Sequence, residues 1–378
     1  MECYLDNSAT TAVSPEVAAL VYHMMTEEFG NPSSLHHRGF AAERAISAAR
    51  SQVASVLHAR PEEIVFTSGG TESNNIALLG AAHARRRRGN RIVTTAIEHH
   101  SVLAAAEALQ AEGFEVIFVK PDSSGSISPE AFAAACNEKT ILASCMMVNS
   151  ETGAVNDIAA IAAAARRKNP EVLFHTDCVQ AFCKLDLNPG KWGVQLVSVS
   201  GHKIHAPKGT GALYVAKGVH LVAPLFGSPQ EKGLRPGTEN VPGICGLGLA
   251  AERMSSARIA NAAHFAALRQ RLITNLSQNA DICINSPADA APYIVNLSVA
   301  SIRSEIMIHY LEQFGIYVSS GSACAKGAKS HVLTAMGLSD DRIDSAVRVS
   351  MTDTTTETEI DEFCRRVEQA TREITKKR

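Results

Sequence analysis

Between about residue 15 and residue 255 the chain alternates short apolar runs with longer stretches in which apolar residues recur every three or four positions. The short runs have the length of buried strands, and the longer stretches have the period of helices that pack on a sheet. The predicted strands are 64–67, 91–95, 116–119, 140–148, 172–176, 196–199 and 212–215, and the predicted helices are 41–58, 72–87, 102–112, 129–136 and 158–168. This alternation predicts an α/β fold with a mostly parallel sheet wrapped by helices.

The pattern changes after residue 252, where the strands become shorter and mix with helices. The later elements are a helical stretch to about residue 277, strands at 293–299, 316–319 and 346–351, and an amphipathic helix at 357–376. We interpret residues 1–255 as a large domain and residues 256–378 as a smaller α+β domain. Residues 1–14 are expected to pack beside the small domain.

Composition and charge narrow the possible classes of protein. The 378 residues carry a formal net charge of −2, so no basic field favours direct contact with nucleic acid or with an anionic membrane surface. No apolar run approaches the roughly 18 residues of a membrane span, and the first residues lack the basic and apolar regions of a signal peptide. The nine cysteines show neither CxxC pairs nor zinc-ligand spacing, which favours reduced thiols over disulfides or a metal site. We therefore expect a cytoplasmic protein.

Lys203 lies directly after a histidine, between the predicted strands 196–199 and 212–215. This position fixes the lysine at the end of a strand, and ligands of such sheets bind beyond the carboxyl ends of the strands. Partial desolvation lowers the pKa of a lysine, and a lysine with a lowered pKa can form a Schiff base with a carbonyl cofactor. An ordinary hairpin lysine also explains this stretch when it is taken alone.

The strand at 64–67 leads into a glycine-rich helix start at Gly69, Gly70 and Thr71. Glycines let the backbone come close to a ligand, and the free amides of a helix N-terminus favour an anion such as phosphate. Thr71 can donate its hydroxyl as well. The same residue types also form plain helix caps, so this motif alone does not decide between the two roles.

Further strand ends carry His99, polar residues at 149–153, Asp177 and, one turn later, Gln180. A histidine in this place can stack on a flat ring or shuttle protons, and it can equally cap a helix. A carboxylate at Asp177 can pair with a protonated pyridine nitrogen, whereas its alternative role is a helix N-cap. A phosphate cradle, an imidazole, a carboxylate and a Schiff-base lysine are together the parts of a pyridoxal phosphate enzyme.

Six motifs along the chain share a further pattern. They are YLDNSATT at 4–11, FGNPSS at 29–34, TSGGTESN at 67–74, SGHK at 200–203, RPGT at 235–238 and SSGSAC at 319–324. With them the chain resembles the cysteine desulfurases of the NifS/IscS type, in the class V group of fold-type I pyridoxal phosphate enzymes, over nearly its whole length. The last motif is the specific one, because aminotransferase and lyase relatives share the lysine and phosphate motifs.

The resemblance implies a fold-type I transferase with a mostly parallel, seven-stranded sheet, and it implies roles for single residues. Lys203 is expected to hold pyridoxal 5'-phosphate and to act as a catalytic residue. Asp177 is expected to keep the pyridine nitrogen protonated, and His99 to stack on the ring as a further catalytic residue. The expected partners of the phosphate group are Gly70, Thr71, Ser200 and His202 of one subunit and Thr238 of a second subunit, so a homodimer is implied.

The remaining implied contacts concern the phenolic oxygen of the cofactor and the substrate carboxylate. Gln180 is expected to contact that oxygen. Ser150 stands where the family commonly has an asparagine, and its shorter side chain can reach the oxygen only through a water. Arg348 matches the family arginine that grips the substrate α-carboxylate, a bidentate contact that a lysine cannot reproduce, and Asn31 is expected to assist it.

The implied reaction converts L-cysteine to L-alanine and leaves the sulfur as a persulfide on Cys324, for delivery to a sulfur-acceptor protein in iron–sulfur cluster assembly or thiolation. Cys324 lies close to Lys326 in a loop of small residues, and a basic neighbour helps a thiol of pKa about 8.5 to act as a thiolate. Two alternatives stay open. A class V selenocysteine lyase or aminotransferase explains every motif except Cys324, and a non-catalytic partner-binding subunit explains the fold but predicts the loss of Lys203 or Asp177.

Overall fold

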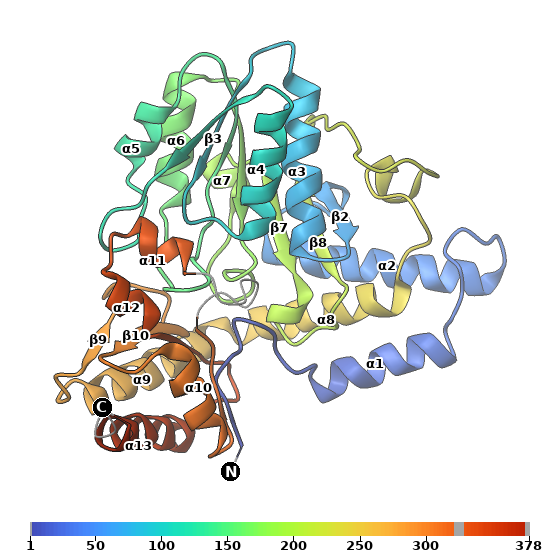
Figure 1. Ribbon diagram of the computed structural model, residues 1–378. Helices are drawn as coiled ribbons and strands as arrows, with labels where there is room; N and C mark the ends of the chain where they lie inside the picture. Colours follow the sequence, from blue (N-terminus) through green and yellow to red (C-terminus); the bar gives the residue numbers. More distant parts are fainter. Residues whose placement is uncertain (1, 321–328, 375–378) are drawn as a thin grey trace.

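A seven-stranded sheet forms the centre of the larger part of the chain in the computed structural model, which describes residues 2–320 and 329–374 (Figure 1). Its strands are β2 (Ile64–Thr67), β3 (Arg91–Thr95), β4 (Glu115–Val119), β5 (Thr140–Ser144), β6 (Leu173–Asp177), β7 (Leu196–Ser200) and β8 (Gly211–Val215). The order across the sheet is β2-β8-β7-β6-β5-β3-β4, with β8 antiparallel to both neighbours and all other pairs parallel. The predicted α/β class with a mostly parallel sheet is confirmed.

Helices cover both faces of this sheet, which is why its strands are apolar on both sides. The helices of one face are α3 (Gly70–Arg85) and α4 (His100–Ala111), and those of the other are α5 (Pro129–Ala135) and α6 (Ile158–Lys168), with α7 (Pro189–Trp192) packed beside α6 (Figure 1). In α6 the buried residues Ile158, Ile161, Ala162 and Ala165 recur at helical spacing. The sheet edge that holds the carboxyl ends of the parallel strands stays uncovered by these helices.

A further helical layer extends to the right in Figure 1 and consists of α1 (Pro15–Thr26), α2 (His37–Val56) and α8 (Val241–Ser256). Helices α2 and α8 approach so closely that a Cβ atom on Gly248 would lie 2.7 Å from the Cα of Ala49. Only glycine fits at such a contact. Three short 3-10 turns complete this part of the chain, namely η1 (Pro61–Glu63), η2 (Gly201–Lys203) and η3 (Gln230–Gly233).

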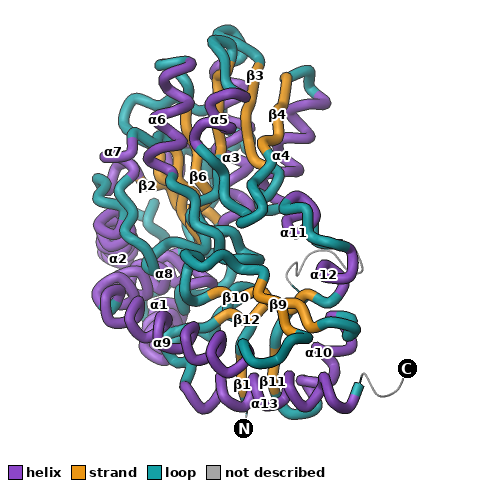
Figure 2. The backbone as a smooth tube through the Cα atoms, turned by 90° about the vertical axis from the view of Figure 1, so that its left-hand side faces the viewer, coloured by secondary structure: helices purple, strands orange, loops and turns teal. Residues whose placement is uncertain are grey.

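The C-terminal part of the chain contains two small sheets (Figure 2). Its elements are α9 (Arg258–Leu276), β9 (Ile282–Ile284), β10 (Ile294–Val299), α10 (Ser304–Glu312), β11 (Ile316–Tyr317), α11 (His331–Ala335), α12 (Asp340–Asp344), β12 (Ala346–Ser350) and α13 (Glu357–Glu373). Strands β12-β10-β9 form an antiparallel sheet, and β11 pairs in parallel with β1 (Cys3–Tyr4) from the start of the chain. The first residues therefore lie against the C-terminal part.

The structure corrects two predicted elements. The strand predicted at 140–148 ends at Ser144 in the structure, and Val148 bridges back to Val155 in the loop that follows. The helical stretch predicted up to about residue 277 consists of two helices, because the ψ of −2° at Ala257 interrupts the helical backbone between α8 and α9.

Two further observations concern the described residues as a whole. Every helix within 2–320 and 329–374 is too short or too polar to cross a membrane. Eight cysteines lie in these ranges as free thiols, and seven of them are buried while Cys283 is exposed. The ninth, Cys324, lies outside the described residues.

Candidate active site

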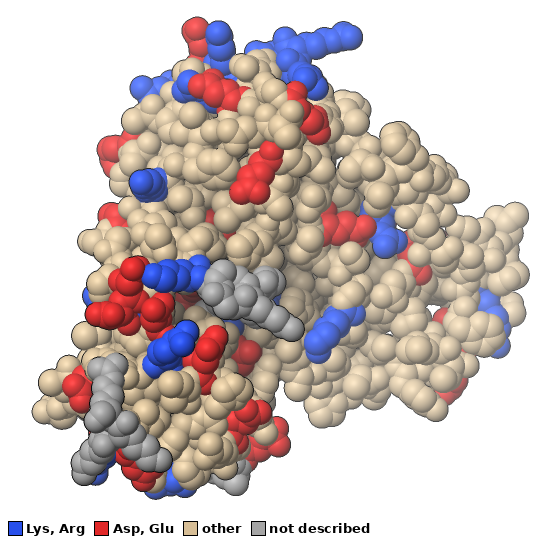
Figure 3. Space-filling view, viewed as in Figure 1, with Lys and Arg blue, Asp and Glu red and all other residues tan. Residues whose placement is uncertain are grey.

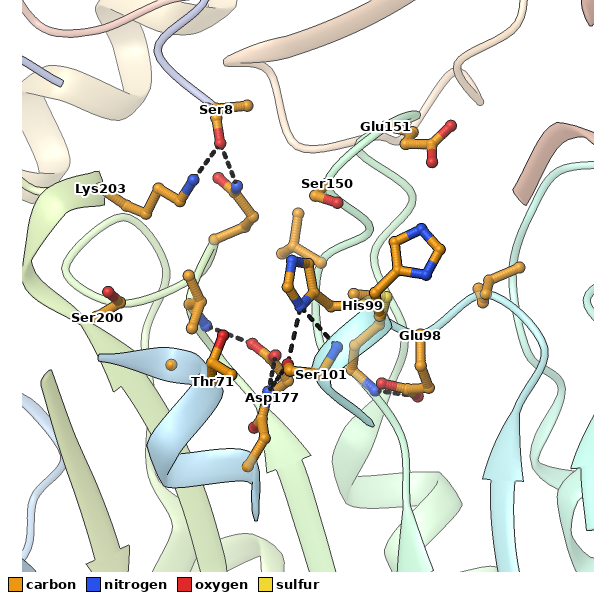
Figure 4. A pocket seen from close by; sticks show the side chains of 18 of the residues that line it. Ser8, Thr71, Glu98, His99, Ser101, Ser150, Glu151, Asp177, Ser200 and Lys203 are labelled. Atoms are coloured by element: carbon orange, nitrogen blue, oxygen red, sulfur yellow. Dashed lines mark hydrogen bonds between the residues drawn. The ribbon is translucent and has the colours of Figure 1, made fainter. Parts of the chain in front are cut away.

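A cavity of about 300 Å³ opens at the carboxyl ends of the parallel strands, and Figure 4 shows it from close by. It receives side chains from the sheet edge, from the N-terminal segment and from the C-terminal part of the chain. Ten of the residues predicted from the sequence line it, namely Gly70, Thr71, His99, Ser150, Asp177, Gln180, Ser200, His202, Lys203 and Arg348. Residues far apart in the sequence thus meet at one site, as expected for ligand binding at the end of such a sheet.

Lys203 ends the turn η2 directly after β7 and points its amine into this cavity (Figure 4). Its Nζ donates to the carbonyl oxygens of Ser8 and Ala9 at 2.5 and 2.6 Å. Burial, together with the positive charges of Arg348 and Lys184, lowers the pKa of Lys203 to about 7. A substantial fraction of this amine is therefore neutral, and so nucleophilic, near neutral pH.

Asp177 is the last residue of β6 and lies buried at the floor of the cavity (Figure 4). Its Oδ1 accepts the amide N–H of Val179 at 2.9 Å, and its Oδ2 accepts Nδ2 of Asn74 at 2.7 Å. Asn74 comes from the second turn of α3 and also donates to the hydroxyl of Ser101. The carboxylate is held in one orientation and presents a fixed negative charge to the cavity. Asn74 is the last residue of the motif at 67–74, but the sequence analysis assigned it no role of its own.

His99 caps α4 and lines the cavity beside Ser101 (Figure 4). Its Nδ1 accepts the amide N–H of Ser101 at 3.1 Å and lies 2.8 Å from the hydroxyl oxygen of the same residue. A ring nitrogen that accepts a backbone N–H carries no proton, so the neutral ring is protonated at Nε2. Burial lowers the pKa of His99, as does the positive charge of Lys203. The site therefore contains a neutral imidazole with a defined tautomer.

The N-terminus of α3 forms the side of the cavity that suits an anion. A Cβ atom on Gly70 would lie 2.7 Å from Cγ2 of Val179, so the backbone here has no room for a larger residue. Free amides and the helix dipole favour a phosphate group at such a place. Ser200 and His202 lie beside it, and burial lowers the pKa of His202 to about 4, with Lys203 adding to this effect. His202 is consequently a neutral donor or acceptor near neutral pH.

Arg348 enters the cavity from β12, on the side opposite the sheet. Its Nη2 lies 2.7 Å from Oδ1 of Asp6, and its Nη1 donates to the carbonyl oxygen of Ser150 at 2.9 Å. Its side chain is 3% exposed. The guanidinium is thus a buried, oriented cation, which is the arrangement that a bidentate carboxylate contact requires.

The backbone at Arg348 also anchors the segment that leads to Cys324. The amide of Arg348 donates to the carbonyl oxygen of Ser319 at 2.6 Å, five positions before the cysteine. After the undescribed residues 321–328, Ser330 donates to Oε2 of Glu151 at 2.5 Å. The described residues on both sides of Cys324 are therefore fixed to groups at or next to the cavity, although the cysteine itself lies outside the described residues.

Residues 149–151 form a turn. Oδ1 of Asn149 accepts the amides of Glu151 and Thr152 at 2.9 and 3.0 Å, and its Nδ2 donates to the carbonyl oxygen of Ile97. Asn149 therefore stabilises the turn, whereas Ser150 lines the cavity. Its predicted contact with a cofactor stays a prediction.

Two predicted residues lie away from this cavity. Asn31 is not among its lining residues, and its Oδ1 accepts the amide of Ser33 at 2.9 Å in a local turn. Thr238 is exposed in the segment between η3 and α8 and also does not line the cavity. The prediction for Thr238 refers to the site of a second subunit, so one chain alone does not test it.

Glu98 is a fully buried carboxyl group in the cavity wall, to which the sequence analysis assigned no role (Figure 4). Its Oε1 accepts the hydroxyl of Thr95 and the amide of Met146, both at 2.8 Å. Among the described residues no hydrogen-bond partner reaches its Oε2. Burial raises the pKa of Glu98 to about 8, so this carboxyl group is neutral over most of the physiological range.

This raised pKa predicts a pH-dependent stability difference between the wild type and Glu98→Gln. Folded Glu98 keeps a proton between its ordinary pKa of 4.5 and about 8, where the unfolded chain has lost it. Its contribution to stability is therefore present at low pH and is lost as the pH rises through this window. Glutamine is isosteric and stays neutral. As the pH rises through this window, the free energy of unfolding of the variant should therefore increase relative to that of the wild type, by at most about 1.4 kcal/mol per pH unit.

Denaturant unfolding of the cofactor-free proteins at about pH 5, 6.5 and 8 measures this difference, because these pH values span the window in which the unfolded chain has lost the proton. Glu115→Gln is the matched control, because Glu115 is exposed and is paired with Arg91 on the surface. Parallel pH curves for Glu98→Gln and the wild type would contradict the buried neutral carboxyl group.

Comparison with known proteins identifies the family of this chain. Residues 3–363 match the Aminotransferase class-V family. A protein named cysteine desulfurase IscS from Methanosarcina thermophila is 41% identical over 361 residues, which cover 95% of this chain and 89% of that protein. The protein of the same name from Anaeromyxobacter dehalogenans is 42% identical over 365 residues, with coverage of 95% and 89%.

Solved structures give the same assignment. A NifS-like protein superposes with a TM-score of 0.93 at 36% identity and covers 98% of this chain and 99% of its own. A structure described as SspA in complex with cysteine has a TM-score of 0.82 at 34% identity and covers 92% and 98%. The chain therefore belongs to the class V aminotransferase family and, within it, to the cysteine desulfurases of the NifS/IscS type.

Proposed function

We propose that this chain is a pyridoxal phosphate-dependent cysteine desulfurase that converts L-cysteine to L-alanine and holds the sulfur as a persulfide on Cys324. The observation that carries the proposal is the cavity in which Lys203, with a pKa lowered to about 7, meets Asp177 and the buried cation of Arg348. An amine nucleophile, an anion and a carboxylate-binding cation in one cavity are the groups that this chemistry needs.

The residues of the cavity fit pyridoxal phosphate. Gly70 and Thr71 at the start of α3, with Ser200 and His202 beside them, provide amides, hydroxyls and a neutral imidazole for its phosphate. Oε1 of Gln180 is buried and has no hydrogen-bond partner among the described residues, while its Nε2 donates to the carbonyl oxygen of Ser8 at 3.0 Å. That amide keeps a second N–H for the phenolic oxygen of a bound cofactor.

Each chain residue then has a defined task. Bound pyridoxal phosphate supplies a ring that accepts the electron pair of the substrate Cα–H bond. Lys203 attaches the cofactor and, once released as a free amine, takes the Cα proton on its Nζ. Asp177, oriented by Asn74, stabilises the positive charge of the pyridine nitrogen. His99 would face the ring as a neutral imidazole with its proton on Nε2.

The sulfur step belongs to Cys324. Its thiolate attacks the sulfur of the bound substrate, so that an S–S bond forms and the C–S bond breaks with its electron pair left on carbon. The carbon takes up protons and becomes the methyl group of alanine, and the cysteine becomes a persulfide. Atoms and electrons balance without an added oxidant. The persulfide sulfur can then pass to a sulfur-acceptor protein in iron–sulfur cluster assembly or thiolation.

Incubation of the purified protein with pyridoxal phosphate and L-cysteine, followed by assays for alanine and for sulfide released by a thiol reductant, tests the proposal. We expect alanine and sulfide in equal amounts. Formation of a keto acid in place of alanine would favour an aminotransferase. Turnover of selenocysteine without turnover of cysteine would favour a selenocysteine lyase, and the absence of turnover with bound cofactor would favour a partner-binding subunit.

Arg348→Lys is expected to weaken cysteine binding. Lysine cannot reproduce the bidentate contact, and a charged hydrogen bond contributes about 1.5–3 kcal/mol, so the KM for L-cysteine should rise about 10- to 150-fold. Steady-state kinetics at saturating cofactor measures this change. The matched control is Arg271→Lys, because Arg271 binds Asp361 and Glu357 on the surface. An unchanged KM for Arg348→Lys would mean that another group holds the carboxylate.

The homodimer is part of this proposal, and exposed apolar side chains support it. They lie on α1, in the connection from α1 to α2, at the start of α2 and in the loop before η3, in the part of the molecule that is mostly tan at the right of Figure 3. They are Tyr22, Met25, Phe29, Leu35, Phe40 and Phe226. The side chain of Phe226, for example, is 95% exposed. A second copy would cover such a patch. Thr238 lies between η3 and α8, in the same stretch between β8 and α8 as Phe226. Sedimentation of the holoenzyme should therefore give the mass of two chains, and a monomer at micromolar concentration would contradict this.

Domain organisation and location complete the proposal. We place the division between α8 and α9, with residues 1–255 in a large domain and residues 256–378 in a small one. The pairing of β1 with β11 supports the placement of residues 1–14 beside the small domain. A cytoplasmic location agrees with persulfide chemistry, which needs a free thiol.

A further inference from the structure

The N-terminal segment 5–14 lies between the turn that carries Lys203 and the strand that carries Arg348. On the lysine side, the amide of Thr11 donates to the carbonyl oxygen of His202 at 2.9 Å, and the carbonyl oxygens of Ser8 and Ala9 accept Nζ of Lys203, as the contact between Ser8 and Lys203 in Figure 4 shows. The segment is therefore part of the wall against which the lysine amine rests.

On the other side the same segment is bound to β12. The amide of Ser350 donates to the carbonyl oxygen of Leu5 at 2.7 Å, and the amide of Ser8 donates to Oγ of Ser350 at 2.8 Å. Asp6 of this segment holds the guanidinium of Arg348. The distance between Lys203 and Arg348 consequently depends on how firmly the segment is held on both sides.

His205 connects all three pieces through one side chain. Its Nδ1 lies 2.8 Å from the carbonyl oxygen of Ala12, and its Nε2 lies 2.7 Å from Oγ1 of Thr352 and 3.0 Å from Oδ1 of Asp353. Its amide also donates to the hydroxyl of Thr11 at 2.9 Å. The residue has a φ of +65°, an uncommon conformation for a residue other than glycine. Such strain persists only where the surroundings hold it.

The two ring nitrogens of His205 reach in opposite directions. The hydroxyl of Thr352 donates its only proton to Oδ1 of Asp353 at 2.9 Å, so its oxygen accepts from Nε2 of His205. Nδ1 faces the carbonyl oxygen of Ala12 on the other side of the ring. The side chain therefore spans the gap between the N-terminal segment and the loop after β12.

The charges around the ring agree with this arrangement. The hydrogen bond from His205 lowers the pKa of Asp353 to about 2. Lys184 is buried nearby, and the negative charge of Asp353 partly offsets the lowering of its pKa by burial. Lys208 and Glu359 line the same groove as His205. One aspartate thus interacts with both His205 and a buried lysine.

We propose that His205 is a positioning residue that clamps the N-terminal segment between the Lys203 turn and the loop after β12, and thereby fixes the separation of Lys203 and Arg348. This inference rests on the proposed function, because it assigns those two residues to cofactor attachment and carboxylate binding. Without the clamp the carbonyl oxygens of Ser8 and Ala9 move relative to Lys203, and Asp6 moves relative to Arg348. The substrate then finds its two anchoring groups at variable distance.

The variant His205→Asn tests the clamp. Asparagine tolerates a positive φ but is too short and uncharged to span the two acceptors. The matched control is His58→Asn, because His58 also has a positive φ, +48°, and an aspartate partner, with Asp186 at 3.7 Å, but is exposed at the end of α2. Any general effect on stability of replacing a histidine of positive φ by asparagine therefore appears in both variants.

Two readouts are compared. Loss of the side-chain hydrogen bonds of His205 should raise the KM for L-cysteine of the His205→Asn holoenzyme about tenfold, with a smaller change in kcat. In the cofactor-free proteins, hydrogen exchange of the amides in segment 5–14 should be about tenfold faster in His205→Asn than in the wild type and in His58→Asn. Exchange in the central strands β6 and β7 should stay the same in all three proteins.

The outcomes separate this inference from the proposed function. A KM and an exchange pattern in His205→Asn equal to those of His58→Asn would overturn the clamp. Uniformly faster exchange over the whole chain with an unchanged KM would also overturn it, because this indicates only a loss of global stability. If the wild type does not convert cysteine, the proposed function fails, while the exchange of segment 5–14 in the cofactor-free proteins still decides whether His205 clamps it.

Discussion

Lys203→Ala is expected to abolish covalent attachment of the cofactor and to lower kcat/KM for L-cysteine at least about 10³-fold, because it removes both the attachment point and a general base. Lys203 is placed for these two tasks by its lowered pKa and by the carbonyl oxygens of Ser8 and Ala9. Alanine offers neither a nucleophile nor a base. Pyridoxal phosphate should still bind without a covalent bond, because Asp177 and the start of α3 are unchanged.

Borohydride reduction followed by peptide mass analysis measures the attachment, and alanine formation measures the turnover. The matched control is Lys208→Ala, because Lys208 is an exposed lysine five positions further along the same turn. The wild type and the control should carry the label on residue 203. A label on another lysine, or turnover by Lys203→Ala close to that of the wild type, would contradict the assignment of Lys203. In the wild type the attachment rate should increase as the pH rises through about 7, because the neutral amine is the nucleophile.

Much of the site was predictable because the sheet places strand ends together. Asp177 ends β6 and Lys203 follows β7, and these strands are parallel neighbours, so polar residues at their ends necessarily meet. Gly70 opens the helix after β2, two strands away on the same sheet. The apolar pattern fixes where each strand ends, and the rule that ligands bind at carboxyl ends supplies the rest. No knowledge of side-chain positions was required for this step.

Groups that act through the backbone could not be predicted in this way. The carbonyl oxygens of Ser8 and Ala9 hold the amine of Lys203, but a carbonyl oxygen leaves no trace in the sequence. Asn74 was missed because its partner, Asp177, lies 103 positions away. The burial of Glu98 likewise depends on Thr95 and on the turn at Met146, which the sequence had suggested to be a strand.

The resemblance to relatives and the geometry differ in what they say about single residues. Arg348 lines the cavity as a buried cation, in agreement with its expected role. Asn31, for which a role in substrate binding was expected, instead closes a local turn, and Asn149 closes another. A short polar side chain beside a turn often satisfies the backbone first, and sequence patterns do not reveal which use it makes of its oxygen.

Cys324→Ser is expected to stop sulfur transfer while leaving substrate binding intact. A serine hydroxyl does not ionise near neutral pH and is a poor nucleophile toward sulfur, so kcat for alanine should fall on the order of 10³-fold or more, as for other lost nucleophiles. The KM for L-cysteine should stay within about threefold, since the charged contact of Arg348 that holds the carboxylate is retained. Intact-protein mass after brief cysteine treatment should show one added sulfur atom in the wild type and none in the variant.

Cys283→Ser is the matched control, because Cys283 is the exposed cysteine among the described residues and lies on β9, outside the cavity. If Cys283→Ser keeps both alanine formation and the added sulfur while Cys324→Ser loses both, the sulfur is taken by Cys324 and not by the exposed thiol of Cys283. Undiminished alanine formation by Cys324→Ser, with free sulfide as the other product, would instead show that the C–S bond breaks without a protein thiol. The enzyme would then be a lyase, and the motif at 319–324 would have no role in the breaking of the C–S bond.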